Sequence, residues 1–118
     1  MDIDTFRNYC LNKKGVNESL PFDENVLVFK VLSKVFALTN LIQKPMAVNL
    51  KCDPEKSIDL RELHPEITPG YHMNKKHWNT VIFESNLPST LLHQLIDHSY
   101  ELVVTKMTKK EKTLLEGL

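Results

Sequence analysis

The chain has few of the residues from which common enzyme motifs are built. It contains three glycines, and no GxGxxG, GxxxxGK[ST] or GxSxG pattern occurs. Phosphate-cradling loops and nucleophile elbows depend on glycine, because it lets the backbone approach a ligand closely and turn sharply. We therefore expect a protein that is not an enzyme.

Metal and redox motifs are also missing. Cys10 and Cys52 have no CxxC partner, and the five histidines form no HxH or HExxH pattern. His72 and His77 flank one turn, but a zinc site needs three or four convergent ligands. We expect no metal and no other cofactor. The two cysteines are expected to be buried thiols in a reducing compartment.

Long apolar runs and an excess of one charge are absent. No stretch approaches the roughly 18 apolar residues that a membrane span requires, and the acidic first four residues do not resemble a signal peptide. We expect a cytoplasmic protein with no membrane contact. The formal net charge is zero, which argues against strong nonspecific DNA binding but leaves room for a local basic patch.

What the chain does contain is typical of one globular domain covering residues 1–118. Hydrophobic residues make up 42% and charged residues 25%. Apolar periodicity predicts the order α-β-β-β-α-β-β-α-α, and therefore a two-layer α+β domain with an antiparallel sheet of about five strands and helices on one face. The predicted helices are 2–14, 54–63, one starting after Pro88 and one after Thr108. The predicted strands are 26–31, 35–39, 45–51, 71–73 and 78–84. Residues 16–25 and 64–70 are predicted loops.

Several helix ends carry clear sequence signals. Asp2 or Asp4 can cap the first helix, and Gly15 can end it in a left-handed conformation. Asp53 followed by Pro54 favours a second helix start. Further apolar contacts are expected from Ile58, Leu60 and Leu63, and a capping box is expected from Thr108 and Glu111.

The stretch from residue 69 to residue 84 is the most distinctive part of the sequence. It holds the single tryptophan, Trp78, and the pair Lys75-Lys76, and it has no acidic residue before Glu84. The β-rich runs at 71–73 and 78–84 predict a hairpin with Lys75, Lys76 and His77 at its tip. We expect Trp78 to be largely buried and to connect this hairpin to the helical layer.

The same stretch carries a family resemblance. Tyr71-His72-Met73-Asn74-Lys75 and His77-Trp78-Asn79-Thr80-Val81 closely resemble the signature of the MmcQ/YjbR family, and the segments 29–38 and 50–55 resemble its hairpin and third strand. The resemblance implies a CyaY-like fold, also described as a double-wing arrangement, and a proposed DNA-binding role. Iron binding of the CyaY type does not carry over, because the first helix lacks an acidic ridge.

The expected DNA contacts are basic. Side chains long enough to reach phosphates are Lys75, Lys76 and His77 at the hairpin tip, and Lys30, Lys34 and Lys51 on the first three predicted strands and their turn. Base edges are usually read by Arg, Asn or Gln, and among these the better placed are Asn74 and Asn79. We expect Asn74, Trp78 and Asn79 to shape or support the tip, and we count Tyr71 and His72 as further motif or structural residues.

Three interpretations of this pattern stay open. In the first, the tip and the first hairpin bind double-stranded DNA. In the second, Trp78 and a partly apolar sheet face bind another protein or a small ligand. In the third, Tyr71 and Trp78 simply anchor the hairpin to the core and the lysines only solvate it. A continuous positive band favours DNA, whereas a deep apolar pocket favours a ligand.

Overall fold

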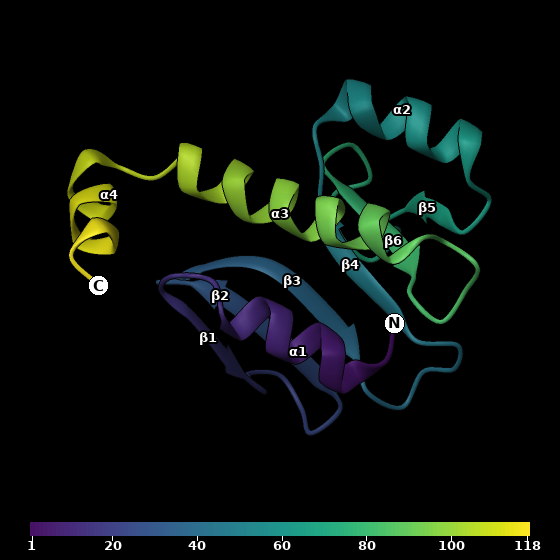
Figure 1. Ribbon diagram of the computed structural model, residues 1–118, viewed down its shortest axis with the longest axis horizontal. Helices are drawn as coiled ribbons and strands as arrows, with labels where there is room; N and C mark the ends of the chain where they lie inside the picture. Colours follow the sequence, from purple (N-terminus) through teal and green to yellow (C-terminus); the bar gives the residue numbers. More distant parts are fainter.

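The computed structural model describes all residues from 1 to 118. The chain forms four helices and six strands, arranged as Figure 1 shows. In chain order these are α1 (Ile3–Leu11), β1 (Val16–Ser19), β2 (Val26–Val31), β3 (Lys34–Asn40), β4 (Ala47–Lys51), α2 (Pro54–Leu63), β5 (Ile67–Pro69), β6 (Trp78–Ile82), α3 (Ser89–Thr105) and α4 (Lys109–Glu116).

The strands form one antiparallel sheet in the order β1-β2-β3-β4-β6-β5. Helices α1 and α3 lie across one face of it, and α2 lies near β5 (Figure 1). The core between the layers holds the ring of Phe6 on α1, with the rings of Phe29 and Phe83 edge-on at 5.1 and 5.4 Å. The predicted two-layer α+β fold is confirmed, with six strands instead of about five.

Strand β1 replaces part of a predicted loop. Its residues pair with β2 from Val16 opposite Val31 to Ser19 opposite Val28. Only one of its four residues is strongly apolar, so local β-propensity is weak. The exposed edge of β2 and an ion pair between Glu18 and Arg7 of α1 hold this segment in place.

The second hairpin is real, but its first strand was misplaced. Strand β5 is Ile67–Pro69, and residues 70–77 form the connecting loop to β6. Thr68 pairs with Thr80 in this short ladder. Residues 64–70 were predicted to be a loop because they contain Pro69, and proline is unusual in strands. It is tolerated here because β5 is an edge strand.

Helix α2 buries less than the sequence predicts. Leu60 is buried, but Ile58 is 62% and Leu63 is 73% exposed, so the predicted contacts of these two residues are wrong. Ile58 is two positions from Leu60 and therefore about 200° around the helix axis. The helix lies at the edge of the sheet against β5, where a single narrow face can be covered.

The predicted helix starts are confirmed, but α1 ends at Leu11 with Asn12 as its C-cap, so the prediction that the first helix reaches residue 14 and is closed by Gly15 is wrong. Asp2 accepts a hydrogen bond from the backbone of Thr5, and Gly15 has φ +75°. Asp53 caps α2 with Pro54 in its first turn. Thr108 begins α4 with a complete capping box, whose other member is Glu111.

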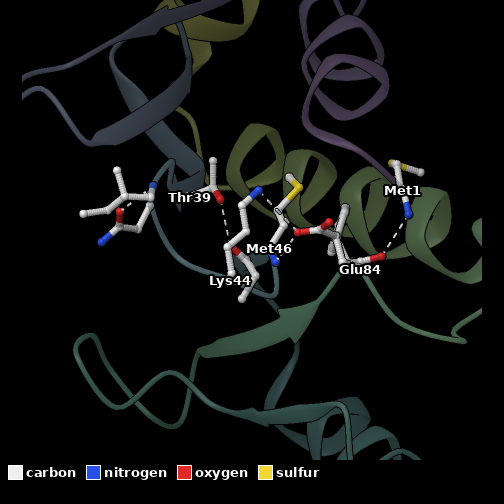
Figure 2. A network of polar contacts seen from close by, with 9 residues as sticks. Met1, Thr39, Lys44, Met46 and Glu84 are labelled. Carbon is white, nitrogen blue, oxygen red and sulfur yellow. Dashed lines mark hydrogen bonds and ion pairs between the residues drawn. The ribbon is translucent and has the colours of Figure 1, made fainter.

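Glu84 closes the end of the sheet that lies opposite the 70–77 loop. Figure 2 shows its carboxylate accepting from the backbone N–H of Met46 at 2.6 Å, with Nζ of Lys44 at 3.8 Å. The amino group of Met1 donates to the carbonyl of Phe83, and Thr39 Oγ1 donates to the carbonyl of Ala47. These contacts join the β3–β4 connection to the end of β6. No helix of the chain is long and apolar enough to span a membrane.

Candidate nucleic-acid interface

The loop of residues 70–77 is a compact turn built around Asn74. The Oδ1 atom of Asn74 accepts hydrogen bonds from the backbone N–H groups of Lys76 (2.9 Å) and His77 (3.3 Å). Its carbonyl accepts from the N–H of Trp78 at 2.9 Å. An asparagine that bonds to the following backbone fixes a turn. Asn74 therefore shapes the tip as predicted, and it is exposed.

A buried network anchors this loop to α2. Nε of Arg61 donates to Oδ1 of Asn79 at 2.8 Å, and Nη2 of Arg61 donates to the carbonyl of Lys75 at 2.6 Å. Asn79 Nδ2 donates to Ser57 Oγ at 3.2 Å. Asn79 is only 2% exposed, so the prediction that it could read base edges is wrong. It supports the tip instead.

Arg61 is the residue that the sequence prediction missed. Ser57 and Arg61 are four positions apart, so they project from the same side of α2. With Asn79 pointing to the helical layer, that side meets β6. The signal that could have found Arg61 is its spacing of four positions from Ser57 on α2, because the apolar residues of this helix do not form one continuous face.

Trp78 is buried on the face of the sheet that the helices leave open. It is 9% exposed, as predicted. Asn79 faces α2, and neighbouring side chains in a strand point to opposite faces, so the predicted connection of Trp78 to the helical layer is wrong. Nζ of Lys51, the residue opposite Trp78 in β4, lies 6.0 Å from its ring centroid. The loop packs closely against Trp78, because a Cβ atom added at Gly70 would lie 3.0 Å from the Cβ of Trp78.

The other motif aromatic does not anchor the hairpin. Tyr71 is 63% exposed, and its ring lies 5.3 Å from Nζ of Lys75. His72 and Met73, next in the loop, border a cavity on the open face of the sheet. The interpretation in which both aromatic residues anchor the hairpin is therefore wrong for Tyr71, whereas Trp78 is buried, although on the open face of the sheet.

Basic side chains gather at one end of the sheet. Because neighbouring strands are antiparallel, the start of β3, the end of β4 and the start of β6 lie at the same end. Lys34 begins β3, Lys51 ends β4, and the 70–77 loop leads into β6. We call this the basic end, defined by Lys34, Lys51, Lys75, Lys76, His77 and Lys106.

The basic end is continuous across β4. Lys34, Lys51 and Lys106 border one cavity, and Lys51, Lys106 and His77 border the next. Lys30 alternates along β2 with the core residues Phe29 and Val31, so its side chain is on the open face. Of the predicted contacts, the structure thus brings Lys34, Lys51 and His77 to neighbouring cavities, together with Lys106.

These lysines have no acidic partners. The three ion pairs of the structure are Arg7–Glu18, Lys13–Asp97 and Lys44–Glu84. None involves the basic end. A group of lysines without acidic partners creates a local positive potential.

The open face of the sheet also contains a cavity of about 530 Å³. Apolar side chains from Val26, Leu38 and Met73 line it together with the exposed ring of Phe22. Its polar lining includes Asn49 and His72. The size falls within the range of small-molecule pockets.

Groups for catalysis do not converge. No three His, Cys, Asp or Glu side chains are grouped as metal ligands would be. Cys10 and Cys52 are both buried and unpaired. Burial raises the pKa of the Cys10 thiol to about 12 and also raises the pKa of Cys52. Both thiols therefore stay protonated and are poor nucleophiles.

Comparisons with known proteins agree with this fold. Residues 11–102 match the model of the YjbR family. The chain is 33% identical to the uncharacterized protein YjbR of Escherichia coli K12 over the full length of both, and 37% identical to the uncharacterized protein YbdF of Escherichia coli O157:H7, covering 92% of this chain and 89% of that protein.

Solved structures extend the likeness to three dimensions. The crystal structure of the Deinococcus radiodurans protein DR2400, a DUF419 domain, is 45% identical with a TM-score of 0.90, covering 97% of this chain and 87% of that one. A crystal structure from Pseudomonas syringae is 30% identical with a TM-score of 0.76, covering 87% and 99%. The sequence and the fold together show that this chain belongs to the YjbR family.

Proposed function

We propose that the protein is a non-catalytic, cytoplasmic module that binds the phosphate backbone of double-stranded DNA through its basic end. The observation that carries this proposal is the gathering of lysines without acidic partners at one end of the sheet. Two buried, unpaired thiols suit a reducing compartment.

The tip supplies the first contacts. Lys75 and Lys76 are exposed, and the backbone beneath them is held by Asn74 and Arg61. A rigid loop loses little conformational entropy when its side chains engage a ligand. His77 is half-buried beside them, and Lys34 extends the same surface across β4. Phosphate contacts of this kind position a protein without reading sequence.

The expected affinity is weak and strongly dependent on salt. A net charge of zero supplies no overall attraction, so binding depends on the local field of the basic end. Each phosphate neutralised contributes about 0.9 to the slope of log affinity against log salt concentration. With no arginine free at the tip, base-specific recognition is limited to Asn74.

Fluorescence anisotropy with labelled duplexes at several salt concentrations tests this proposal. The double change Lys75→Ala, Lys76→Ala should lower affinity for every duplex and reduce the salt slope by about two, since each lysine accounts for roughly one contact. Folding should survive, because exposed loop lysines contribute little to stability.

Two control variants test whether the effect comes from the charge of these lysines and from their position. Lys75→Arg with Lys76→Arg keeps both charges and should keep the salt slope. Lys44→Ala removes a charge at the opposite end of the sheet, beside Glu84, and should leave the slope unchanged. Binding that ignores both salt and the double alanine change would exclude the tip as the DNA site.

A second candidate function follows from the cavity of about 530 Å³ on the open face. There the protein would bind a small ligand or a partner side chain against Phe22, Leu38 and Met73. Replacing Leu38 with Asp would place a charge in this cavity. If binding of DNA persists in Leu38→Asp but is lost in the double lysine variant, the basic end is the functional surface and the cavity is not.

A further inference from the structure

Strands β3 and β4 separate at the basic end, and α3 crosses the gap. Their ladder ends with Ala37 opposite Leu50. Beyond that point Ser99 of α3 bridges the strands, because its hydroxyl accepts from the N–H of Lys51 at 2.9 Å and donates to the carbonyl of Phe36 at 2.5 Å. Ser99 is fully buried. This bridge fixes the backbone that carries the Lys51 side chain.

Next to this bridge lies a cavity of about 280 Å³ with five lining residues. Three of them are lysines: Lys34 from β3, Lys51 from β4 and Lys106 from the C-terminal end of α3. The other two are Val35 and Val103. The volume is about nine times the roughly 30 Å³ that one water occupies in the liquid, which leaves room for a phosphate or a diphosphate.

No acidic side chain lines this cavity or pairs with its lysines. The hydrogen bond from the backbone N–H of Thr108 lowers the pKa of the Glu111 carboxyl group, and the nearby charge of Lys34 adds to this effect. Asp53 borders the adjoining cavity, and its carboxylate caps α2. The neighbouring acids are thus already used as helix caps.

The cluster is unfavourable without an anion. Burial, followed by the charges of Lys106 and Lys34, lowers the pKa of Lys51 below its ordinary value. Three like charges around one cavity repel one another, and a multiply charged anion at their centre would reverse the sign of that interaction. Lysine binds phosphate in this way, as a point charge on a long stem.

We propose that Lys34, Lys51 and Lys106 form a binding pocket for a phosphate group. The pocket is separate from the loop tip and does not depend on the tip binding DNA. The phosphate belongs either to a nucleic-acid backbone or to a small free phosphate compound, since both present the same oxyanion. Ser99 is a positioning residue for Lys51.

Calorimetric titration of the full chain with sodium pyrophosphate at low ionic strength tests the pocket. Saturable one-to-one binding is expected. It should weaken at least about tenfold in Lys51→Met, because a charge-assisted hydrogen bond is lost while the apolar stem is kept. Lys106→Gln should weaken it similarly, and Lys106 is exposed at a helix end, so this second variant does not endanger folding. Lys44→Met, the matched loss of charge at the far end, should bind as the wild type does.

The source of the phosphate is separated by a competition experiment. If the phosphate belongs to DNA, pyrophosphate should displace a labelled duplex, and Lys51→Met should weaken duplex binding. If it belongs to a small compound, pyrophosphate should bind without affecting the duplex, or should bind even when no duplex binds at all. Absence of saturable pyrophosphate binding, or equal binding by wild type, Lys51→Met and Lys106→Gln, would overturn the pocket whatever the outcome with DNA.

Discussion

Individual polar residues at the site owe their roles to the face of the element from which they project. Arg61 projects from α2 toward the sheet and holds the loop that carries Lys75. Asn79 seemed suited to base contacts, yet it faces the helical layer and is buried. In both cases the residue type was informative only once the sheet had defined inside and outside.

At His98, folding stability is coupled to pH. Its Nε2 accepts a hydrogen bond from the N–H of Asp53 at 3.1 Å, which requires the neutral ring. Burial, with the charge of Lys56 adding to it, lowers the pKa of His98 below 6.5, against the opposing effects of Asp53 and Glu101. The folded state therefore resists protonation of this ring more than the unfolded state does.

The predicted consequence is a loss of stability in mild acid. Above about pH 6.5 the ring is neutral in both states, and as pH falls below that value the unfolded state takes up the proton first. Urea denaturation at about pH 7.5 and about pH 5.5 measures the difference. His98→Gln keeps an acceptor for Asp53 but cannot titrate, so its loss of stability across this range should be smaller. An equal loss in both proteins would show that His98 does not contribute.

Among the secondary-structure elements, α3 is the one that holds the sheet together where its central strands part. Ser99→Ala would leave the N–H of Lys51 and the carbonyl of Phe36 buried without a partner. Leaving such groups unsatisfied costs about 1–3 kcal/mol each, so we expect a loss of at least about 2 kcal/mol in the free energy of unfolding. Ser89→Ala on the exposed first turn of the same helix is the control and should have little effect. Equal denaturation midpoints for the two variants would contradict the bridging role.

Strand β6 depends on Trp78 in a different way. Trp78→Ala should cost about 3 kcal/mol, the lower end for a large buried aromatic residue, because its ring lies outside the main core. Tyr71→Ala, which removes an exposed aromatic residue from the same loop, should cost much less. Denaturation of the tryptophan variant at wild-type urea concentrations would mean that Trp78 is a contact residue and not a packing residue.

The sequence was most informative where local chemistry decides structure. The caps at Asp2, Asp53 and Thr108 were predictable because each bonds to its own helix. Strand β1 was not, because its conformation depends on pairing with β2. The face of the sheet on which Trp78 lies was not predictable either. Both faces of β6 carry apolar residues, and only the contact of α2 with Asn79 shows which face is covered by helices.

The candidate site was predictable only in part, for the same reason. Lys75, Lys76 and His77 were found because they are adjacent in sequence. Lys51 and Lys106 are 55 positions apart, and the topology brings them to one cavity. The charge pattern of the chain gives no hint of this, because acidic residues elsewhere balance the total.

At the scale of the whole molecule, the two ends of the sheet differ in how their charges are paired. One end carries lysines without acidic partners, whereas at the opposite end Lys44 pairs with Glu84. We therefore expect the protein to approach a polyanion with the basic end forward. The position of the DNA on the protein is therefore a stronger test than affinity alone.

The most direct measurement is a titration of the isotope-labelled protein with a short duplex, followed by amide chemical shifts at low salt. We predict shift changes concentrated in residues 71–77 and around Lys34, Lys51 and Lys106, which reverse when salt is raised. Changes centred instead on Phe22, Leu38 and Asn49 would assign function to the open-face cavity. No change at any residue at low salt would contradict DNA binding by this protein.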